Sequence, residues 1–109
     1  MSREIFTLTL AAALVAVQGC AVTPVSSQAQ NVRVISEAQS KNCRFINTIS
    51  TNNGNTLSEN PEEEARNRAL NRVAELGGNA LRIVTTNQQV APSGVGSLFA
   101  LTGEAYSCK

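Results

Sequence analysis

The stretch "NPEEEARNRALNRVAELGGNAL", residues 60–81, contains the clearest structural element of the chain. Asn60 can cap a helix, and Pro61 suits the first helical position. The three glutamates that follow place negative charge at the positive end of the helix dipole. Gly77 and Gly78 end the pattern, as glycine does at the C-termini of helices. The stretch therefore predicts a helix that begins at Pro61 and stops before Gly77.

One stripe of this helix is apolar and the rest is charged. The apolar positions recur at helical spacing and are Ala65, Ala69, Val73 and Leu76, widened by Leu70. Glutamate and arginine alternate on the other faces, with Glu62–Arg66 and Glu64–Arg68 as i,i+4 pairs in the favoured orientation. An acidic site at Glu62–Glu64 and an anion-binding strip at Arg66, Arg68 and Arg72 are the functional alternatives. The spacing favours a helix start with ion pairs and a solvated face.

Four short runs on either side of the helix are typical of strands, at residues 32–35, 43–49, 80–85 and 98–108. The polar stretches "EAQSKN", "STNNGNTLSEN" and "NQQVAPSGVGS" between them are expected to be turns and loops. The predicted order is β-β-α-β-β. One helix covers one face of a sheet, which suits an antiparallel sheet, so residues 32–109 are expected to form a small α+β domain.

The N-terminus does not belong to this domain. Residues 5–17 form an apolar run that only Thr7 and Thr9 interrupt, and Arg3 precedes it. The run is shorter than the roughly 20 residues of a membrane-spanning helix, and it lacks the polar face of a core helix. Its length and position fit the apolar region of a secretory signal. Residues 1–19 are therefore expected to be a signal peptide.

The run ends at Val17-Gln18-Gly19-Cys20, which resembles the bacterial lipobox; Gln18 departs from the commoner small residue. The resemblance implies that Cys20 receives a diacylglycerol, becomes the new N-terminus and is acylated. Several acyl chains make such an anchor durable, since one chain alone holds only marginally. Ala21, in place of the aspartate that often retains such proteins in the inner membrane, points to the outer membrane of a Gram-negative cell.

The chain has three cysteines. If Cys20 carries lipid, Cys43 and Cys108 remain, and two cysteines in an oxidising compartment most simply form a disulfide. Two free buried thiols are the alternative. A metal site is disfavoured because two thiolates without histidine fall short of four ligands.

Residues 21–31, "AVTPVSSQAQN", contain a proline, two serines and two glutamines and little to bury. They are expected to be a flexible tether after the lipidated Cys20. Eleven residues reach at most about 40 Å when fully extended, and a coil of that length spans nearer about 20 Å.

The composition argues against several classes of function. The chain contains no histidine and no aspartate, so it lacks the usual general bases and metal ligands. A net charge of +1 gives no strong field for nucleic acid. The "SGVGS" segment, residues 93–97, lacks the Gly-Lys-Ser/Thr ending of a phosphate loop. We expect no enzymatic activity, no cofactor, no metal and no nucleic-acid partner.

The lipobox, the "VRVI" strand, the cysteine-bearing strand, the helix ending "AELGGNAL" and the terminal Tyr-Ser-Cys together resemble a family. It is the group of bacterial lipoproteins known as domain of unknown function 4156. The chain is also distantly similar to the C-terminal domain of the Rcs envelope-stress sensor lipoprotein, a disulfide-bearing α/β module. That sensor has a long proline-rich segment where this chain has only residues 21–31.

These observations together predict a non-enzymatic lipoprotein, held in the outer membrane through Cys20 and facing the periplasm. We expect its domain to act through contacts with an envelope protein. A stress-sensing role and a small-ligand-binding role are the alternatives; the second requires a pocket with converging polar groups.

Overall fold

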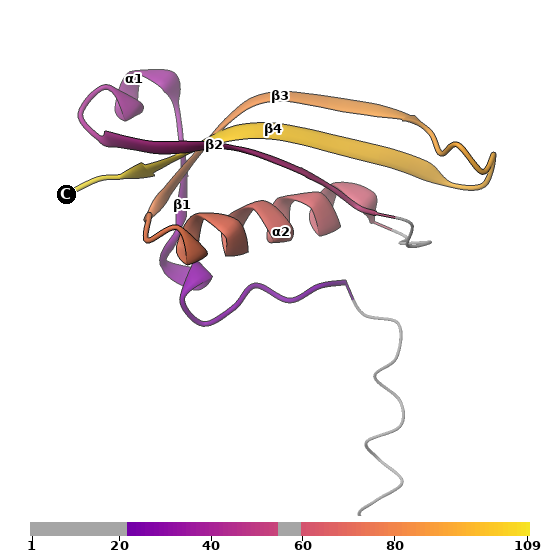
Figure 1. Ribbon diagram of the computed structural model, residues 1–109, viewed down its shortest axis with the longest axis horizontal. Helices are drawn as coiled ribbons and strands as arrows, with labels where there is room; N and C mark the ends of the chain where they lie inside the picture. The colour runs from indigo at the N-terminus through magenta and orange to yellow at the C-terminus, as the bar shows by residue number, and fades with distance from the viewer. Residues whose placement is uncertain (1–21, 55–59) are drawn as a thin grey trace, which may run out of the picture.

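The computed structural model describes residues 22–54 and 60–109 (Figure 1). The predicted signal peptide and Cys20 lie outside the described residues. A twisted sheet forms one layer and a long helix lies along one of its faces. The elements, in chain order, are the 3-10 helix η3 (Ala29–Asn31), β1 (Arg33–Ile35), α1 (Glu37–Ser40), β2 (Arg44–Asn52), α2 (Pro61–Glu75), β3 (Ala80–Val90) and β4 (Ser97–Ser107).

The sheet has the strand order β1-β3-β4-β2. β4 pairs antiparallel with both β2 and β3, whereas β1 pairs parallel with β3. The α+β class and the β-β-α-β-β order of the strands and the main helix are confirmed, but the wholly antiparallel sheet was wrong, because the sheet is mixed. The two central strands, β3 and β4, form a long hairpin, and β1 and β2 are the edge strands.

Helix α2 begins and ends as its sequence predicts. The Asn60 side chain accepts a hydrogen bond from the Glu63 N–H at 3.4 Å, and Pro61 occupies the first turn. Gly77 has a φ of +81°, a conformation that favours glycine at the residue after a helix. The apolar stripe of the helix is fully buried against the sheet at Ala65, Ala69 and Val73.

The two residues after Gly77 join the helix tightly to the last strand. A Cβ atom on Gly78 would lie 2.9 Å from the Tyr106 carbonyl oxygen and 3.0 Å from a Val73 methyl carbon, so a side chain does not fit there. The N–H of Asn79 donates to the same Tyr106 carbonyl at 3.0 Å. The "LGGNAL" segment, residues 76–81, therefore packs tightly against the end of β4 as the chain leaves α2.

The core lies between α2 and the sheet face that it covers. Its buried sheet residues are Ile49, Leu81, Phe99, Leu101 and Ala105. A second, smaller cluster of Ile35, Ala80 and Tyr106 lies at the end of the sheet where the two cysteines pack.

The described part of the expected tether is instead held along α2. The Thr23 N–H donates to Glu64 at 2.8 Å, and the Ser26 N–H donates to Asn71 at 2.8 Å. Ala29, in η3, is buried. We call residues 23–31 the N-terminal strap; for this segment the flexible-tether expectation was wrong, because the helix supplies partners for its backbone.

The strap also explains the parallel pairing of β1. It follows α2 from the first turn of the helix towards the last, so the chain reaches β1 beside the end of α2 where β3 also begins. The Arg33 N–H donates to the Asn79 carbonyl at 3.0 Å at that point. Two strands that start at the same end of the sheet and run away from it are parallel.

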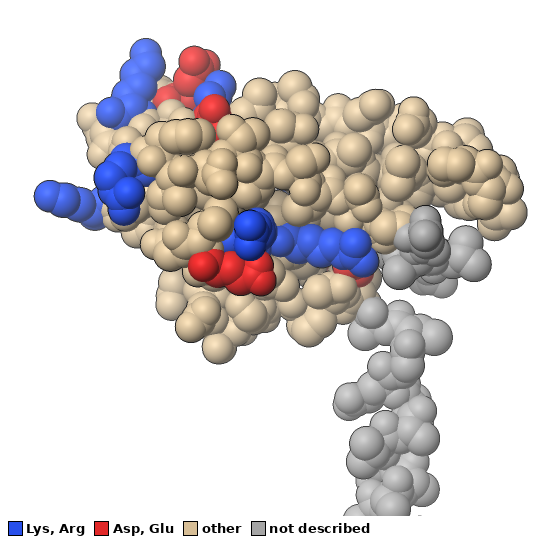
Figure 2. Space-filling model, in the orientation of Figure 1, with Lys and Arg blue, Asp and Glu red and all other residues tan. Residues whose placement is uncertain are grey.

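Three polar segments also differ in part from the loops expected there. β2 continues to Asn52 and so includes the first three residues of the "STNNGNTLSEN" segment. The "EAQSKN" segment contains α1, which a capping box between Ser36 and Gln39 begins. β3 continues to Val90, because its outer half pairs with the start of β4, as in the pair Gln88↔Phe99. The outer part of the β3–β4 hairpin, residues 83–103, contains no charged residue. The end of the molecule that this part forms accordingly shows no blue or red in Figure 2.

Candidate functional site

A groove of about 490 Å³ runs between β2 and α2. Its lining from β2 is the consecutive run 47–51. Successive strand residues point to opposite faces of a sheet, so a hollow lined by five in a row must follow the edge of the strand. We call this hollow the β2–α2 groove.

The other wall of the groove is one stripe of α2, formed by Arg68, Asn71, Arg72, Glu75 and Leu76. These positions are spaced by three and four residues and so share a face of the helix. Figure 1 shows α2 lying lengthwise beside β2, and Figure 2 shows basic side chains along the seam between helix and sheet. The wall is polar, with two arginines and one glutamate.

The floor of the groove is an open strand edge. β2 is the last strand of the sheet and has β4 as its one neighbour among the described strands. The Thr48 N–H donates to the side-chain oxygen of Asn47 at 2.9 Å, which places this N–H on the side away from β4. Backbone groups alternate in direction along an antiparallel strand, so those of Ser50 face the same open side.

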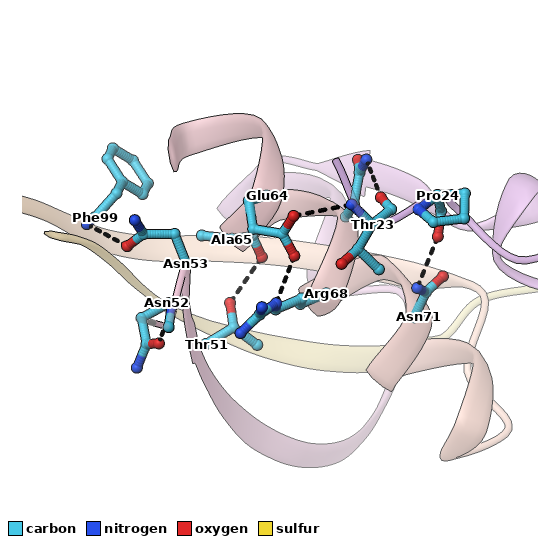
Figure 3. A network of polar contacts seen from close by, with 12 residues as sticks. Thr23, Pro24, Thr51, Asn52, Asn53, Glu64, Ala65, Arg68, Asn71 and Phe99 are labelled. Carbon is cyan, nitrogen blue, oxygen red and sulfur yellow. Dashed lines mark hydrogen bonds and ion pairs between the residues drawn. The ribbon is translucent and has the colours of Figure 1, made fainter. Parts of the chain in front are cut away.

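The end of the groove near the start of α2 is fixed by a buried carboxylate (Figure 3). Glu64 is 4% exposed. It accepts hydrogen bonds from the Thr23 N–H at 2.8 Å and from Arg68 Nε at 2.6 Å. The Arg68 guanidinium is thereby held over Gly54, whose added Cβ would lie 3.0 Å from an arginine nitrogen. Glu64 therefore joins the strap, the helix and the groove.

Burial raises the pKa of the Glu64 carboxyl, but the hydrogen bonds from Thr23 and the ion pair with Arg68 together outweigh it and lower the pKa below its ordinary value. Glu64 is therefore a charged structural group at neutral pH. A general acid or base needs a pKa near the working pH, and this shift moves Glu64 away from that range.

Buried polar contacts also connect β2 to α2 and β4. Thr51 donates to the Ala65 carbonyl at 2.8 Å. The Asn53 side chain accepts from the Phe99 N–H and donates to the Ser97 carbonyl, both at 2.9 Å. Since Asn53 is 1% exposed, these bonds hold the end of β2, and with it the groove, in place (Figure 3).

A second charged cluster lies on the opposite face of the sheet. Arg82 pairs with Glu104 at 2.8 Å, and the Tyr106 hydroxyl donates to the same carboxylate at 2.7 Å. The hydrogen bond from Tyr106, more than the ion pair with Arg82, lowers the pKa of Glu104 against the effect of burial. Every charge here has a partner on a neighbouring residue, so the cluster is structural.

The two cysteines of the domain form a disulfide, Cys43–Cys108, beside this cluster. Cys43 precedes β2 and Cys108 follows β4, so the bond closes the end of the antiparallel pair. The pairing predicted from the cysteine count is present in the structure.

The helix-face residues singled out in the sequence form ion pairs, except Glu63, which accepts a hydrogen bond from the Asn60 side chain at 3.0 Å. Glu62 pairs with Arg66 at 3.1 Å and Glu64 with Arg68 at 2.6 Å, as the spacing predicted. Arg72 pairs with Glu75 at 3.5 Å. The 93–97 segment lies in the β3–β4 hairpin.

Within residues 22–54 and 60–109, no group of three or more histidine, cysteine, aspartate or glutamate side chains is arranged to hold a metal ion. None of the helices among these residues has the length and apolar character needed to cross a membrane.

Sequence reasoning did not single out Asn47, Ser50 or Asn71 as site residues. Their position in a groove depends on β2 being an edge strand, and that follows from the sheet order. The signal that could have indicated it is the composition of β2, whose residues 47–52 are all Asn, Thr or Ser except Ile49.

The sequence model of one protein family, described as a domain of unknown function (DUF4156), matches residues 23–108. The chain belongs to this family, and the match begins at the strap. A search among curated proteins finds no match.

Proposed function

We propose that this member of the DUF4156 family is an outer-membrane lipoprotein of the bacterial envelope. Its disulfide-stapled domain faces the periplasm, lacks enzymatic activity and a cofactor, and acts through contacts with another envelope protein. The signal-like residues 1–19 and the lipobox resemblance around Cys20 support the anchor. The disulfide supports an oxidising compartment.

The strap limits how far such a domain extends from its anchor. Thr23 is bonded to Glu64 in the first turn of α2, and Cys20 precedes Thr23 by three residues. Three residues span at most about 10 Å. In the proposed arrangement the membrane therefore lies close to the start of α2.

The observation that carries the proposed role in protein contacts is the open edge of β2 in the β2–α2 groove. Unpaired strand edges are ready templates for pairing with another chain, and proteins usually cover them or guard them with charges and prolines. β2 is nine residues long, contains no proline and has one charged residue, Arg44, at its start. This edge is therefore available to a protein partner.

Mass spectrometry of the membrane fraction tests the anchor. We expect a mature chain that begins at an acylated Cys20, and a Cys20→Ser variant that is no longer processed. An N-terminus at Met1 or a free thiol at Cys20 would overturn the proposal. Separation of inner from outer membranes tests the location, with Ala21→Asp as the variant expected to move the protein to the inner membrane.

Site-specific photo-crosslinking in cells tests the protein contacts. A crosslinker at Ser50, in the groove, is expected to give a defined adduct. A crosslinker at Thr85, exposed on β3 and outside the groove lining, is the matched control and should not give that adduct. Identical adducts from both positions, or none from either, would contradict a role centred on the groove.

A further inference from the structure

The β2–α2 groove combines an open strand edge with a helix wall that lies lengthwise beside it. An extended peptide can bind in such a place by adding a strand to the sheet, so that backbone hydrogen bonds supply affinity and alternate side chains meet the wall. The geometry of the groove allows the chemistry of that peptide to be specified.

The backbone part of the site is occupied by a side chain of the protein itself. The outward Thr48 N–H donates to Asn47 Oδ1 at 2.9 Å. An amide oxygen is the same kind of acceptor as a peptide carbonyl. A strand bound along the edge would therefore replace Asn47 on Thr48 and would meet the outward groups of Ser50 two residues further on.

The helix wall has the repeat of an extended chain. Arg68 and Arg72 are four residues apart, which is a rise of about 6 Å along a helix. Residues two apart in a strand share a face and are separated by about 6.7 Å. Two alternate side chains of a bound strand would thus lie beside the helix positions of Arg68 and Arg72 in turn. The Arg68 side chain reaches towards Glu64 and the Arg72 side chain towards Glu75.

The charges on the wall favour acidic side chains at those positions. Arg68 lines the groove and is held by Glu64 through Nε, and its terminal nitrogens lie over Gly54, just beyond the end of β2. Arg72 is 53% exposed and its pairing with Glu75 is the longest of the three ion pairs within α2, at 3.5 Å. Exposed pairs of this kind are weak, so a carboxylate in the groove can compete for Arg72.

We propose that the β2–α2 groove binds an extended peptide segment that adds to β2 as a further strand and places acidic side chains at two alternate positions against Arg68 and Arg72. This inference rests on the proposed role in protein contacts, since it names the chemistry of the partner.

The test uses the full chain purified from membranes in detergent and a fluorescent, end-blocked heptapeptide of alternating valine and glutamate. Fluorescence anisotropy is expected to show that this peptide binds at least tenfold more tightly than its valine–glutamine counterpart. Arg72→Glu should weaken binding at least fivefold. Arg66→Glu is the matched control, because Arg66 is an exposed arginine of the same helix outside the groove, and it should leave binding unchanged.

Two backbone-methylated peptides test the added strand. Methylation of alternate amides blocks one edge of an extended peptide, so one of the two alternation registers should abolish binding and the other should preserve it. Equal binding of both would overturn the strand-addition geometry, and equal binding of the glutamate and glutamine peptides would overturn the role of the arginines.

Sedimentation velocity separates this inference from pairing between two copies of the chain. A dimer that Arg72→Glu dissolves, with no binding of the peptide, would overturn the acidic peptide in favour of a second copy. Failure of the peptide to bind while Ser50 still crosslinks to a partner in cells would overturn this inference alone, and loss of the Ser50 adduct would overturn the proposed function.

Discussion

Asn79 and Cys108 form a two-point hydrogen-bonded pair between a side chain and the main chain. Asn79 Nδ2 donates to the Cys108 carbonyl at 2.6 Å, and the Cys108 N–H donates to Asn79 Oδ1 at 2.7 Å. The asparagine amide thus continues the strand pairing at the point where β4 ends. The C-terminal cysteine is held by this pair as well as by its disulfide.

Asn79→Ala is expected to destabilise the domain by about 2 kcal/mol, because it removes two hydrogen bonds and leaves the Cys108 main chain without those partners. Urea unfolding followed by circular dichroism measures the change. Asn87→Ala, on the exposed part of β3, is the control and should change stability by less than about 0.5 kcal/mol. Equal stability of the two variants would show that the pair contributes nothing.

The disulfide closes a loop with a sequence separation of 65 residues. Constraining the unfolded chain over such a loop is expected to stabilise the fold by about 4 kcal/mol. Small domains have total stabilities of about 5–15 kcal/mol, so the double variant Cys43→Ala/Cys108→Ala should lose a large part of its stability. Urea unfolding with and without reductant checks this prediction. Reductant should lower the stability of the parent and leave that of the variant unchanged. A parent whose stability does not change in reductant contradicts the prediction.

The features that sequence reasoning predicted are those with local causes. Asn60, Pro61 and Gly77 define α2 within a single stretch, and the alternation of charged pairs along it follows from helical spacing alone. The cysteine pairing followed from a count. Each of these depends on residues that are close in sequence or on a composition that does not require the fold.

The features that sequence reasoning did not predict depend on partners that are distant in the sequence. The strap is hydrogen-bonded to Asn67, 44 residues from Thr23, and to Asn71, 45 residues from Ser26. On a helix wheel these asparagines are indistinguishable from a solvated face. The groove could be predicted only from the order of the strands in the sheet. A polar strand such as β2 offers a binding edge only when no other strand covers it.

Glu64 should make the stability of the domain depend on pH. Burial raises the pKa of Glu64, but the bonds from Thr23 and Arg68 lower it by more than burial raises it. The folded-state pKa therefore lies below the ordinary value of 4.5. The stabilisation is therefore complete above the unfolded-state pKa and is lost as the pH falls through the folded-state pKa. The lowered pKa of Glu104, due first to its bond from Tyr106, adds stability lost in the same direction.

Glu64→Gln is expected to destabilise the domain by about 1–3 kcal/mol at neutral pH, with a difference from the parent that shrinks in acid. Urea midpoints measured across about pH 3–7 give the profile. Glu75→Gln removes an exposed carboxylate from the same helix and should keep the parent's acid dependence. If the parent and Glu64→Gln lose stability in parallel, Glu64 is not the group responsible.

The strap should detach from α2 when its two asparagine partners are removed. Asn67 donates to the Thr23 carbonyl at 2.8 Å; Asn71 accepts from the Ser26 N–H at 2.8 Å and donates to the Pro24 carbonyl at 3.1 Å. In Asn67→Ala/Asn71→Ala these backbone groups lose their partners on the helix. We expect faster amide hydrogen exchange across residues 23–31, by tenfold or more, because the exchanging amides no longer need the whole domain to open.

Arg66→Ala is the control for this experiment, since Arg66 pairs with Glu62 on the exposed side of the same helix and makes no bond to the strap among the contacts described. Exchange in β4 should stay slow in both variants, which shows that the domain remains folded. Slow exchange in the strap of the double variant would mean that the buried Ala29 and the Thr23–Glu64 bond suffice to hold it. Fast exchange would show that the asparagines set the distance between the domain and its proposed anchor, because detachment of the strap restores the reach of about 40 Å that residues 21–31 have as a free segment.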